Sequence, residues 1–455
     1  MPELIEFDSN ALNSLLLSGA SLGVFLLLGL LVRALVPLTR RLFLPAALIG
    51  GFLGLVCGQY VLDIVPAGMS ATWSSLAGVL IAVVFAPMLL GQRLPPFREA
   101  AREAGAQIWM SYFSTFVQVA VPALLVFAVL GPLFGTDPLF STIFEASWSG
   151  GHGTAAGMDE TWTALGWPDG TPLALFAATV GLVYGVVMGT VLLNIAAKRG
   201  HLSHEATARQ VEQADILEEA DQNQATTGRL HASALSNLAF HGSLIALAIL
   251  IGSLFKHVID QVVSGVPLFP LAMIGGLLVQ LAISRTRFRV LVDKPTLNAI
   301  AGVALDFLVV AAIASLAVPI MLANWIPLTI VMLAMAGVSV LIYFHVGPRI
   351  FREDWAENSI AQFGAQTGVV AIGLMLLRAA DPQMRSNAYR AFALRSPFVS
   401  PFIGGGLITA SFPLIAVRYG NLWLGVGCLV LCAVMLAVAR PLGLWNALPR
   451  ARQGV

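Results

Sequence analysis

The stretch at residues 147–157 reads SWSGGHGTAAG, and its glycines are the main indication of the fold of this chain. Glycines stand at positions 150, 151 and 153, and glycines so closely spaced favour an open turn over a continuous helix. The surrounding segment, residues 138–169, is moderately apolar and lies between two long charge-free runs. Backbone that is not helical is tolerated at membrane depth only where protein or water covers its amides. The segment therefore predicts a re-entrant hairpin that lines a pathway.

The rest of the chain has the composition of a membrane protein. Of its 455 residues, 58% are hydrophobic and 11% are charged, which is too little charge for a soluble protein of this length. The net charge of +1 provides no basic surface for nucleic acid. A spanning helix needs about 20 apolar residues, and the apolar runs predict eleven spans, with 295–348 holding two that break near Asn324. They are 9–32, 42–62, 64–92, 104–136, 170–197, 230–255, 261–284, 295–348, 396–417 and 419–439.

Basic residues predict the orientation, because Lys and Arg are retained on the cytoplasmic side. If Met1 is outside, the alternating spans put 23 of the 25 Lys and Arg in cytoplasmic segments, Arg395 among them. Lys256 and Arg418 alone fall outside. The chain is therefore predicted to be a multi-pass protein of the cytoplasmic membrane, with its N-terminus outside and its C-terminus inside.

A second glycine-broken segment, residues 354–382, follows the fourth span of the second set of five. It carries Gly364, Gln366, Thr367 and Gly368. By the predicted topology it starts and ends inside, whereas the segment at 138–169 starts and ends outside. We therefore expect two re-entrant hairpins that enter the bilayer from opposite faces. The alternative is a long surface loop in each place.

A short motif on the second span recurs on the seventh at a constant offset of 225 residues. Because an odd number of spans separates the copies, they run antiparallel, as in the inverted repeats of secondary transporters. The predicted fold is an all-α polytopic membrane protein with two inverted five-helix repeats, each with a re-entrant hairpin, plus an extra C-terminal transmembrane helix. The predicted parts are a first repeat at 1–197, a cytoplasmic linker at 198–235, a second repeat at 236–418 and the extra helix with its tail at 419–455. The matching residues are Pro45, Ala47, Ile49, Gly50, Gly51 and Leu53 against Pro270, Ala272, Ile274, Gly275, Gly276 and Leu278.

Both hairpins offer groups that suit an anionic solute. Each would direct the free amides of a half-helix toward the middle of the membrane, and the positive end of a helix dipole attracts a carboxylate. Ser149 or Thr154 is expected to cap the half-helix of the first hairpin. The candidate substrate-binding residues are Ser149, Gly150, Gly151, His152, Gly153, Thr154, Gln366, Thr367 and Gly368.

Asp306 is the candidate ion-coupling residue. It lies about nine residues, hence roughly 13 Å, into the eighth span, and an acid at that depth is a functional candidate by default. With the hydroxyls of Thr154 and Thr367 it would complete an all-oxygen cation site; the alternative is an acid that only holds helices together. His152 is either a proton relay or substrate ligand, or a structural histidine held by hydrogen bonds.

The run from Ser149 to Gly157 resembles the first re-entrant signature of the bacterial glutamate:sodium symporter family. The resemblance covers nearly the whole chain, including the surroundings of Asp306. It implies paired hairpins, a homodimer with a fixed scaffold and moving transport units in the bacterial inner membrane, and symport of glutamate driven by a sodium ion, with no organic cofactor. Asp306 is the candidate ligand of that ion. Further residues that carry the resemblance are Thr367, Gly368, Gly373, Leu376, Leu377, Arg378, Asp381, Pro382, Ser400, Pro401, Gly404, Gly405 and Gly406.

One departure leaves alternatives open. Where hydroxyl-bearing residues are expected after Gly368, residues 369–372 read VVAI. A proton carried by Asp306 or His152 is therefore an alternative to sodium, and another carboxylate or amino acid is an alternative to glutamate. A passive anion channel is a further hypothesis. An intramembrane hydrolase using Ser149 and His152 is another, but the serine lacks a glycine two residues before it and no orienting acid is evident, so no enzymatic activity is expected.

Overall fold

The structure is a computed structural model, and it describes residues 9–41, 44–92, 97–202, 226, 235–262, 265–382 and 384–446. This part of the chain is helical and contains no strand. Nine of its helices are long and apolar enough to cross a membrane, and Ala46–Cys57 and Leu268–Ser284 are shorter apolar helices. The prediction of an all-α polytopic membrane protein is confirmed. Most of the linker predicted at 198–235 lies outside the described residues.

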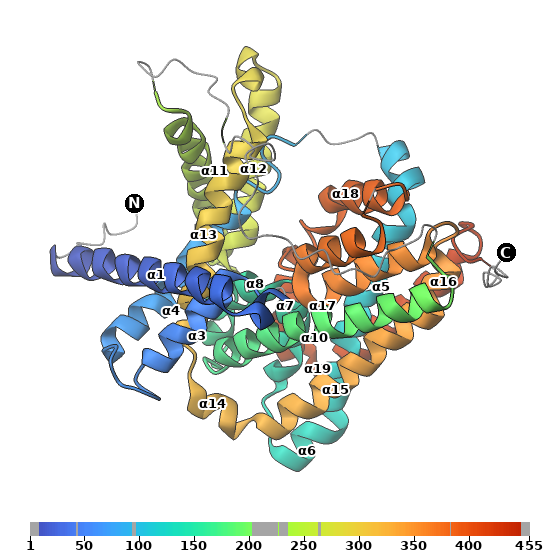
Figure 1. Cartoon of the computed structure of the whole chain (residues 1–455), viewed down its shortest axis with the longest axis horizontal. Helices are drawn as coiled ribbons and strands as arrows, with labels where there is room; N and C mark the ends of the chain where they lie inside the picture. Colours follow the sequence, from blue (N-terminus) through green and yellow to red (C-terminus); the bar gives the residue numbers. More distant parts are fainter. Residues whose placement is uncertain are drawn as a thin grey trace. The chain divides into compact units, whose positions relative to one another are not determined.

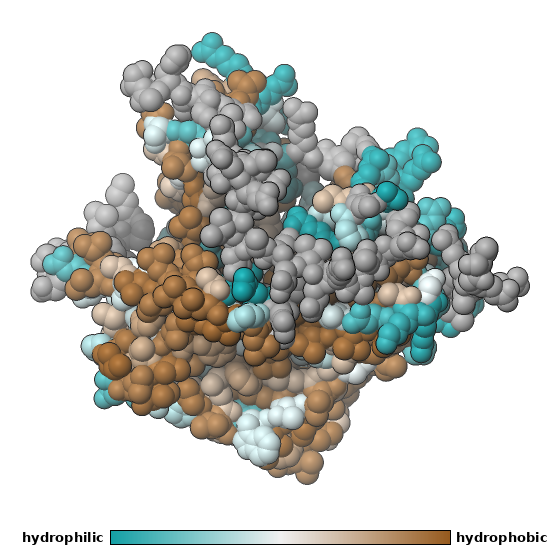
Figure 2. Space-filling view, viewed as in Figure 1, coloured by the Kyte–Doolittle hydropathy of each residue, from teal (hydrophilic) through white to brown (hydrophobic). Residues whose placement is uncertain are grey.

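Large apolar side chains are exposed along the long helices. On α1 (Ser9–Leu35), Leu16, Leu17, Leu27 and Leu31 are all more than half exposed. Figure 2 shows hydrophobic residues, in brown, over much of the face that it draws. Apolar surface left in water costs about 25 cal/mol per Å², so these faces fit contact with lipid.

The chain divides into two compact units, which are described separately, and each takes helices from both halves of the sequence. The first unit contains described residues in 9–91, 235–253 and 271–318, and the second those in 92–202, 254–270 and 319–446. Figure 1 draws the helices of both units in the colours of the sequence. Those of the first unit are α1, α2 (Pro37–Arg41), α3 (Ala46–Cys57), α4 (Ala67–Phe85), most of α11 (Asn237–Ile259) and α12 (Leu268–Ser284), η4 (Arg287–Val290) and α13 (Lys294–Ala314).

The second unit holds the two segments predicted as hairpins. Its long helices are α5 (Phe97–Leu125), α10 (Gly170–Lys198), α15 (Trp325–Leu341), α17 (Trp355–Ala380) and α19 (Leu407–Ala439). Its shorter elements are η1 (Val126–Leu130), α6 (Gly131–Phe134), η2 (Pro138–Thr142), α7 (Ile143–Trp148), α8 (Gly151–Gly157), α9 (Asp159–Ala164), nearly all of α14 (Val318–Ala323), η5 (Ile342–Val346), α16 (Gly347–Ile350) and α18 (Ala388–Val399).

In the first unit, the repeated motif at 45–53 and 270–278 makes equivalent contacts in its two copies. A Cβ added to Gly50 on α3 would collide with the carbonyl oxygen of Phe25 on α1. A Cβ added to Gly275 on α12 would collide with the carbonyl oxygen of Ala248 on α11. The first glycine of each pair therefore lets its helix approach the backbone of the first helix in the same half.

The second glycine of each pair contacts the other half. A Cβ on Gly51 of α3 would lie 2.6 Å from Cβ of Ile313 on α13, and one on Gly276 of α12 would collide with the carbonyl oxygen of Ala86, at the end of α4. The two copies thus exchange partners, because α4 and α13 are the next α-helices after α3 and α12 in their own halves.

In the second unit, α5 and α15 end in the same irregular way. The π-helical turn η1 follows α5, and Gly131 and Pro132 begin α6. The π-helical turn η5 follows α15, and Gly347 and Pro348 begin α16. A proline lacks the amide that would bond four residues back, and a π turn is one way in which a helix absorbs a local irregularity. This second correspondence, at an offset of 216, was not predicted.

The helix α17 folds back on itself. Inside it, Gly368 (φ −146°, ψ 36°) and Val369 (φ 64°, ψ 169°) are not helical. A Cβ added to Gly364 would lie 2.8 Å from Cα of Gly373, whereas nine residues of straight helix would separate them by about 14 Å. The arms 355–367 and 370–380 therefore lie side by side.

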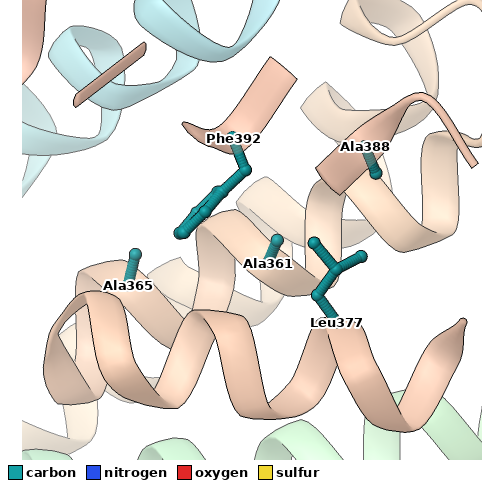
Figure 3. Packing of buried hydrophobic residues seen from close by; sticks show 5 residues of the cluster. All are labelled: Ala361, Ala365, Leu377, Ala388 and Phe392. Atoms are coloured by element: carbon teal, nitrogen blue, oxygen red, sulfur yellow. The ribbon is translucent and has the colours of Figure 1, made fainter. Parts of the chain in front are cut away.

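Apolar side chains fix this bend. Figure 3 shows Ala361 and Ala365 of the first arm and Leu377 of the second packed with Ala388 and Phe392 of α18. All five are buried. Small residues on the first arm allow the second arm and α18 to approach closely.

One predicted span is wrong, because the helix expected over 396–417 is interrupted. The helix α18 ends at Val399 and α19 begins at Leu407. In the loop between them, Gly404 and Gly405 have φ of 65° and 107°, values that glycine tolerates and that a right-handed helix excludes. A second break, at Gly420 (φ 81°, ψ 162°) inside α19, falls close to the border expected between the last two spans.

Candidate functional site

The two broken segments of the second unit meet at their breaks. A Cβ added to Gly151, at the start of α8, would collide with Cγ1 of Val369, at the break of α17. Gly151 has a φ of 73°, which suits glycine, whereas the φ of 64° at Val369 is rare for a β-branched residue. Contact between the two segments therefore depends on a residue without a side chain at position 151.

The loop between α18 and α19 joins the same place. The amide of Gly404 and the hydroxyl of Thr409 donate hydrogen bonds to Oε1 of Glu145 on α7, at 2.8 and 3.2 Å. Glu145 is 1% exposed, and its Oε2 has no hydrogen-bond partner in the described part of the chain. Ser149 adjoins the loop, because a Cβ on Gly404 would lie 3.1 Å from its Oγ. Glu145 thus connects the first segment to the loop, a role that was not predicted from the sequence.

Arg395 on α18 is a buried cation. It is 4% exposed, and its guanidinium donates to Ser111 Oγ and to Gln362 Oε1 and lies 3.9 Å from the ring centroid of Phe392. No described carboxylate forms an ion pair with it. The side chain is buried because α18 packs against α5, which carries Ser111, and against α17, which carries Gln362.

Arg395 lines a cavity of about 50 Å³ with groups from both broken segments. Ser149 comes from the first segment, Gln366 and Val370 from the second, and Gly404 from the loop. The structure thus brings two of the predicted site residues, Ser149 and Gln366, to one cavity. A guanidinium presents its N–H donors in a planar fork that matches a carboxylate, so this cavity suits a carboxylate-bearing ligand.

The hydroxyls of the two predicted threonines, Thr154 and Thr367, each donate to a backbone carbonyl. Thr154 donates to the carbonyl of Gly150 at 3.1 Å, and no side chain caps α8, so the expected cap by Ser149 or Thr154 is absent. Thr367 donates to the carbonyl of Phe363 at 2.8 Å, on its own helix. Both hydroxyls therefore bond to a carbonyl within their own segment.

His152 has the contacts of a structural histidine. It is 6% exposed, and its Nε2 lies 2.9 Å from Oγ1 of Thr179 on α10. The Thr179 hydroxyl donates to the carbonyl of Leu175, so it accepts a hydrogen bond from Nε2–H of the histidine. The remaining predicted residues, Gly150, Gly153 and Gly368, lie in or beside the same two breaks.

Asp306 lies in the first unit, on α13, beside the exposed side chains of Val303 and Leu305, and is itself exposed. Thr154 and Thr367 lie in the second unit, so an ion site shared by these three residues stays a prediction. Among the residues that the structure describes, no three His, Cys, Asp or Glu side chains gather as metal ligands. A cation bound to this part of the chain would therefore be held mainly by amide, hydroxyl and carbonyl oxygens.

A seam of amide side chains joins α5 to the first arm of α17. Gln107 Nε2 donates to Asn358 Oδ1 at 2.9 Å, Gln118 Nε2 to the carbonyl of Gln366 at 2.6 Å, and Gln366 Nε2 to the carbonyl of Ser111 at 3.2 Å. This seam was not predicted, because the sequence over α5 was interpreted only as an apolar run. In the sequence, the seam is indicated by polar residues that recur every three or four positions and so share one face of α5. They are Gln107, Ser111, Ser114, Thr115 and Gln118.

These features define an α-helical membrane protein whose broken helices meet at a buried cationic cavity, an arrangement typical of secondary transporters. A model of the sodium/glutamate symporter family matches residues 9–357. The chain therefore belongs to the sodium/glutamate symporter family, a family of transporters rather than enzymes, and the resemblance stated from the sequence is confirmed. A search of curated proteins found no match. The family match ends within α17, so the break at Gly368 and Arg395 lie beyond it.

Proposed function

We propose that the protein is a secondary transporter that couples entry of Na⁺ to uptake of glutamate or a similar carboxylate solute by alternating access. The family match supports sodium coupling. The observation that supports a carboxylate substrate is the buried guanidinium of Arg395. Burying a charge without an opposite partner costs several kcal/mol. A substrate carboxylate offsets that cost when it forms paired, charge-assisted hydrogen bonds with the guanidinium.

We also propose that the two halves are inverted copies with re-entrant hairpins, over the ranges predicted from the sequence. The exchanged contacts of Gly51 and Gly276 support this proposal, because a two-fold axis between the halves relates each contact to the other. The matching π turns after α5 and α15 support it in the second unit. The back-folded arms of α17 fit a hairpin that enters and leaves on one side.

The remaining parts of the proposal follow from the family resemblance and the charge count. We propose a homodimer in the bacterial inner membrane, with the N-terminus outside and the C-terminus inside. The first unit, which contains the exposed apolar face of α1, would be the fixed scaffold, and the second unit, which contains the cavity, would move.

Transport is tested in vesicles with purified protein. Under an inward Na⁺ gradient, with K⁺ inside and valinomycin to set the voltage, labelled glutamate is expected to accumulate above its outside concentration. Accumulation driven equally by a proton gradient without Na⁺ would support the proton-coupled alternative. Uptake that never exceeds equilibration under any gradient would contradict a carrier coupled to an ion and would favour the channel hypothesis.

Asp306→Asn tests the proposed coupling residue. The change removes the charge at nearly constant volume, so the fold should persist, and accumulation under a Na⁺ gradient is expected to fall at least about tenfold because an intramembrane acid is retained for function. Passive exchange of labelled for unlabelled substrate, measured in the same vesicles, would show whether binding survives. Wild-type accumulation in this variant would remove Asp306 from the mechanism.

A further inference from the structure

A second cavity in the second unit is surrounded by polar side chains that lack partners. It measures about 20 Å³ and lies among α5, the α15–η5 helix and the first arm of α17. Five of the side chains that line it carry an atom with no hydrogen-bond partner in the described part of the chain: Gln118 Oε1, Tyr343 Oη, Ser359 Oγ, Gln362 Nε2 and Gln366 Oε1. Their residues are all at most 6% exposed. Buried polar groups are nearly always paired, so five unpaired atoms around one cavity indicate a ligand.

The hydrogen bonds of the two amides fix which of their atoms is free. Gln118 Nε2 donates to the carbonyl of Gln366, and Gln366 Nε2 donates to the carbonyl of Ser111. A carbonyl accepts only from the NH₂ end of an amide. Both side chains therefore hold their Oε1 as an acceptor without a donor.

The free groups favour a cation. Four of the five unpaired atoms are oxygens: two amide carbonyl oxygens and two hydroxyls. Hard cations in proteins are held by oxygens of this kind. The fifth atom, Gln362 Nε2, is a donor, because Gln362 Oε1 accepts from Arg395, and a water that remains bound to the ion would satisfy it.

We propose that this cavity is a sodium site, in which Gln118, Tyr343, Ser359 and Gln366 are the side-chain ligands. This inference rests on the proposed sodium coupling and adds to it a sodium site formed by α5, η5 and α17, whose ligands do not include Asp306. Gln366 also lines the Arg395 cavity, and Gln362 bonds to Arg395 directly. Binding of the ion would therefore set the position of groups that contact the substrate, which links the two sites through one turn of α17.

The site is tested by direct ion binding to the purified full chain without substrate. Thermal unfolding is followed while NaCl replaces choline chloride at constant ionic strength, because a ligand that binds the folded state raises its stability in proportion to the logarithm of ligand concentration. For the wild type, stability is expected to rise as RT ln(1 + [Na⁺]/Kd) while NaCl replaces choline chloride, and the fit of this curve gives the apparent Kd. In Ser359→Ala and in Tyr343→Phe the apparent Kd for Na⁺ is expected to rise about tenfold, equivalent to about 1.4 kcal/mol.

Two matched variants control for the loss of a buried hydroxyl. Ser147→Ala removes a buried hydroxyl of α7, and Tyr112→Phe removes a half-buried hydroxyl of α5 that donates to the carbonyl of Phe398; neither residue lines this cavity. Both should keep the wild-type Kd for Na⁺ even if they unfold at a lower temperature. If Ser359→Ala and Tyr343→Phe also keep it, the cavity holds water and the inference is wrong, while sodium-driven uptake by the wild type would leave the proposed function standing. A wild type that Na⁺ does not stabilise would also overturn the site, and uptake without Na⁺ would then show that the coupling fails as well.

Discussion

Arg395→Gln is expected to abolish accumulation of glutamate in vesicles without preventing the protein from folding. Truncating one partner of a buried, hydrogen-bonded charge pair costs about 2–5 kcal/mol of binding free energy, so the KM for substrate should rise at least about 30-fold. The fold should tolerate the change, because an uncompensated buried charge is lost and glutamine can still bond to Ser111 or Gln362. Initial uptake rates over a range of glutamate concentrations measure the effect.

Arg390→Gln is the matched control on the same helix. The Arg390 side chain is 66% exposed and pairs with Glu103, and exposed ion pairs contribute about 0–1 kcal/mol. This variant should transport with a KM close to that of the wild type. Arg395→Lys should be intermediate, because an ammonium keeps the charge but not the planar fork. A normal KM in Arg395→Gln would show that the substrate carboxylate binds elsewhere.

Gly151→Ala is expected to reduce transport more than tenfold by separating the two broken segments. The added Cβ would collide with Cγ1 of Val369, and overpacking of this kind costs about 1–3 kcal/mol. The φ of 73° adds a further cost of about 1–2 kcal/mol for a residue with a side chain. Uptake in vesicles, normalised to the amount of folded protein, measures the loss.

The double variant Gly151→Ala/Val369→Ala separates these two costs. Shortening Val369 removes Cγ1 and leaves its Cβ at 3.8 Å from the new methyl group, an ordinary contact. Only the cost of the positive φ should then remain, so transport should recover in part compared with Gly151→Ala alone. If the double variant is no better than the single one, the contact between the two breaks does not matter for transport.

Apolar periodicity and glycine spacing predicted much of this fold. The runs at 9–32 and 170–197 became α1 and α10, and the break near Asn324 separates α14 from α15. These features are local, because a long apolar run without charge has few structures available other than a spanning helix. Glycines 364 and 368 likewise marked the bend of α17.

The cavity was less predictable, because it depends on contacts between residues far apart in the sequence. Arg395 looked like a loop residue beside an apolar run, and only the packing of α18 against α5 and α17 shows that it is buried. Glu145 lay inside the predicted hairpin, but its bonds to Gly404 and Thr409 span more than 250 residues. A buried charge with a distant partner leaves no periodic signal in the sequence. Ser149 and Gln366 were found because glycine-rich breaks surround them.

Each unit contains helices from both halves of the sequence, so neither unit can form completely until the second half has been synthesised. The helix α13 packs against both α3 and α4, yet more than 200 residues of chain separate it from them. When the ribosome has made α1 to α4, the surfaces that α13 will cover still lack their partner, and α5 to α10 likewise await α15 to α19. Neither unit can be completed while the nascent chain is half made, so the newly inserted helices depend on lipid or on insertion factors until the late helices arrive.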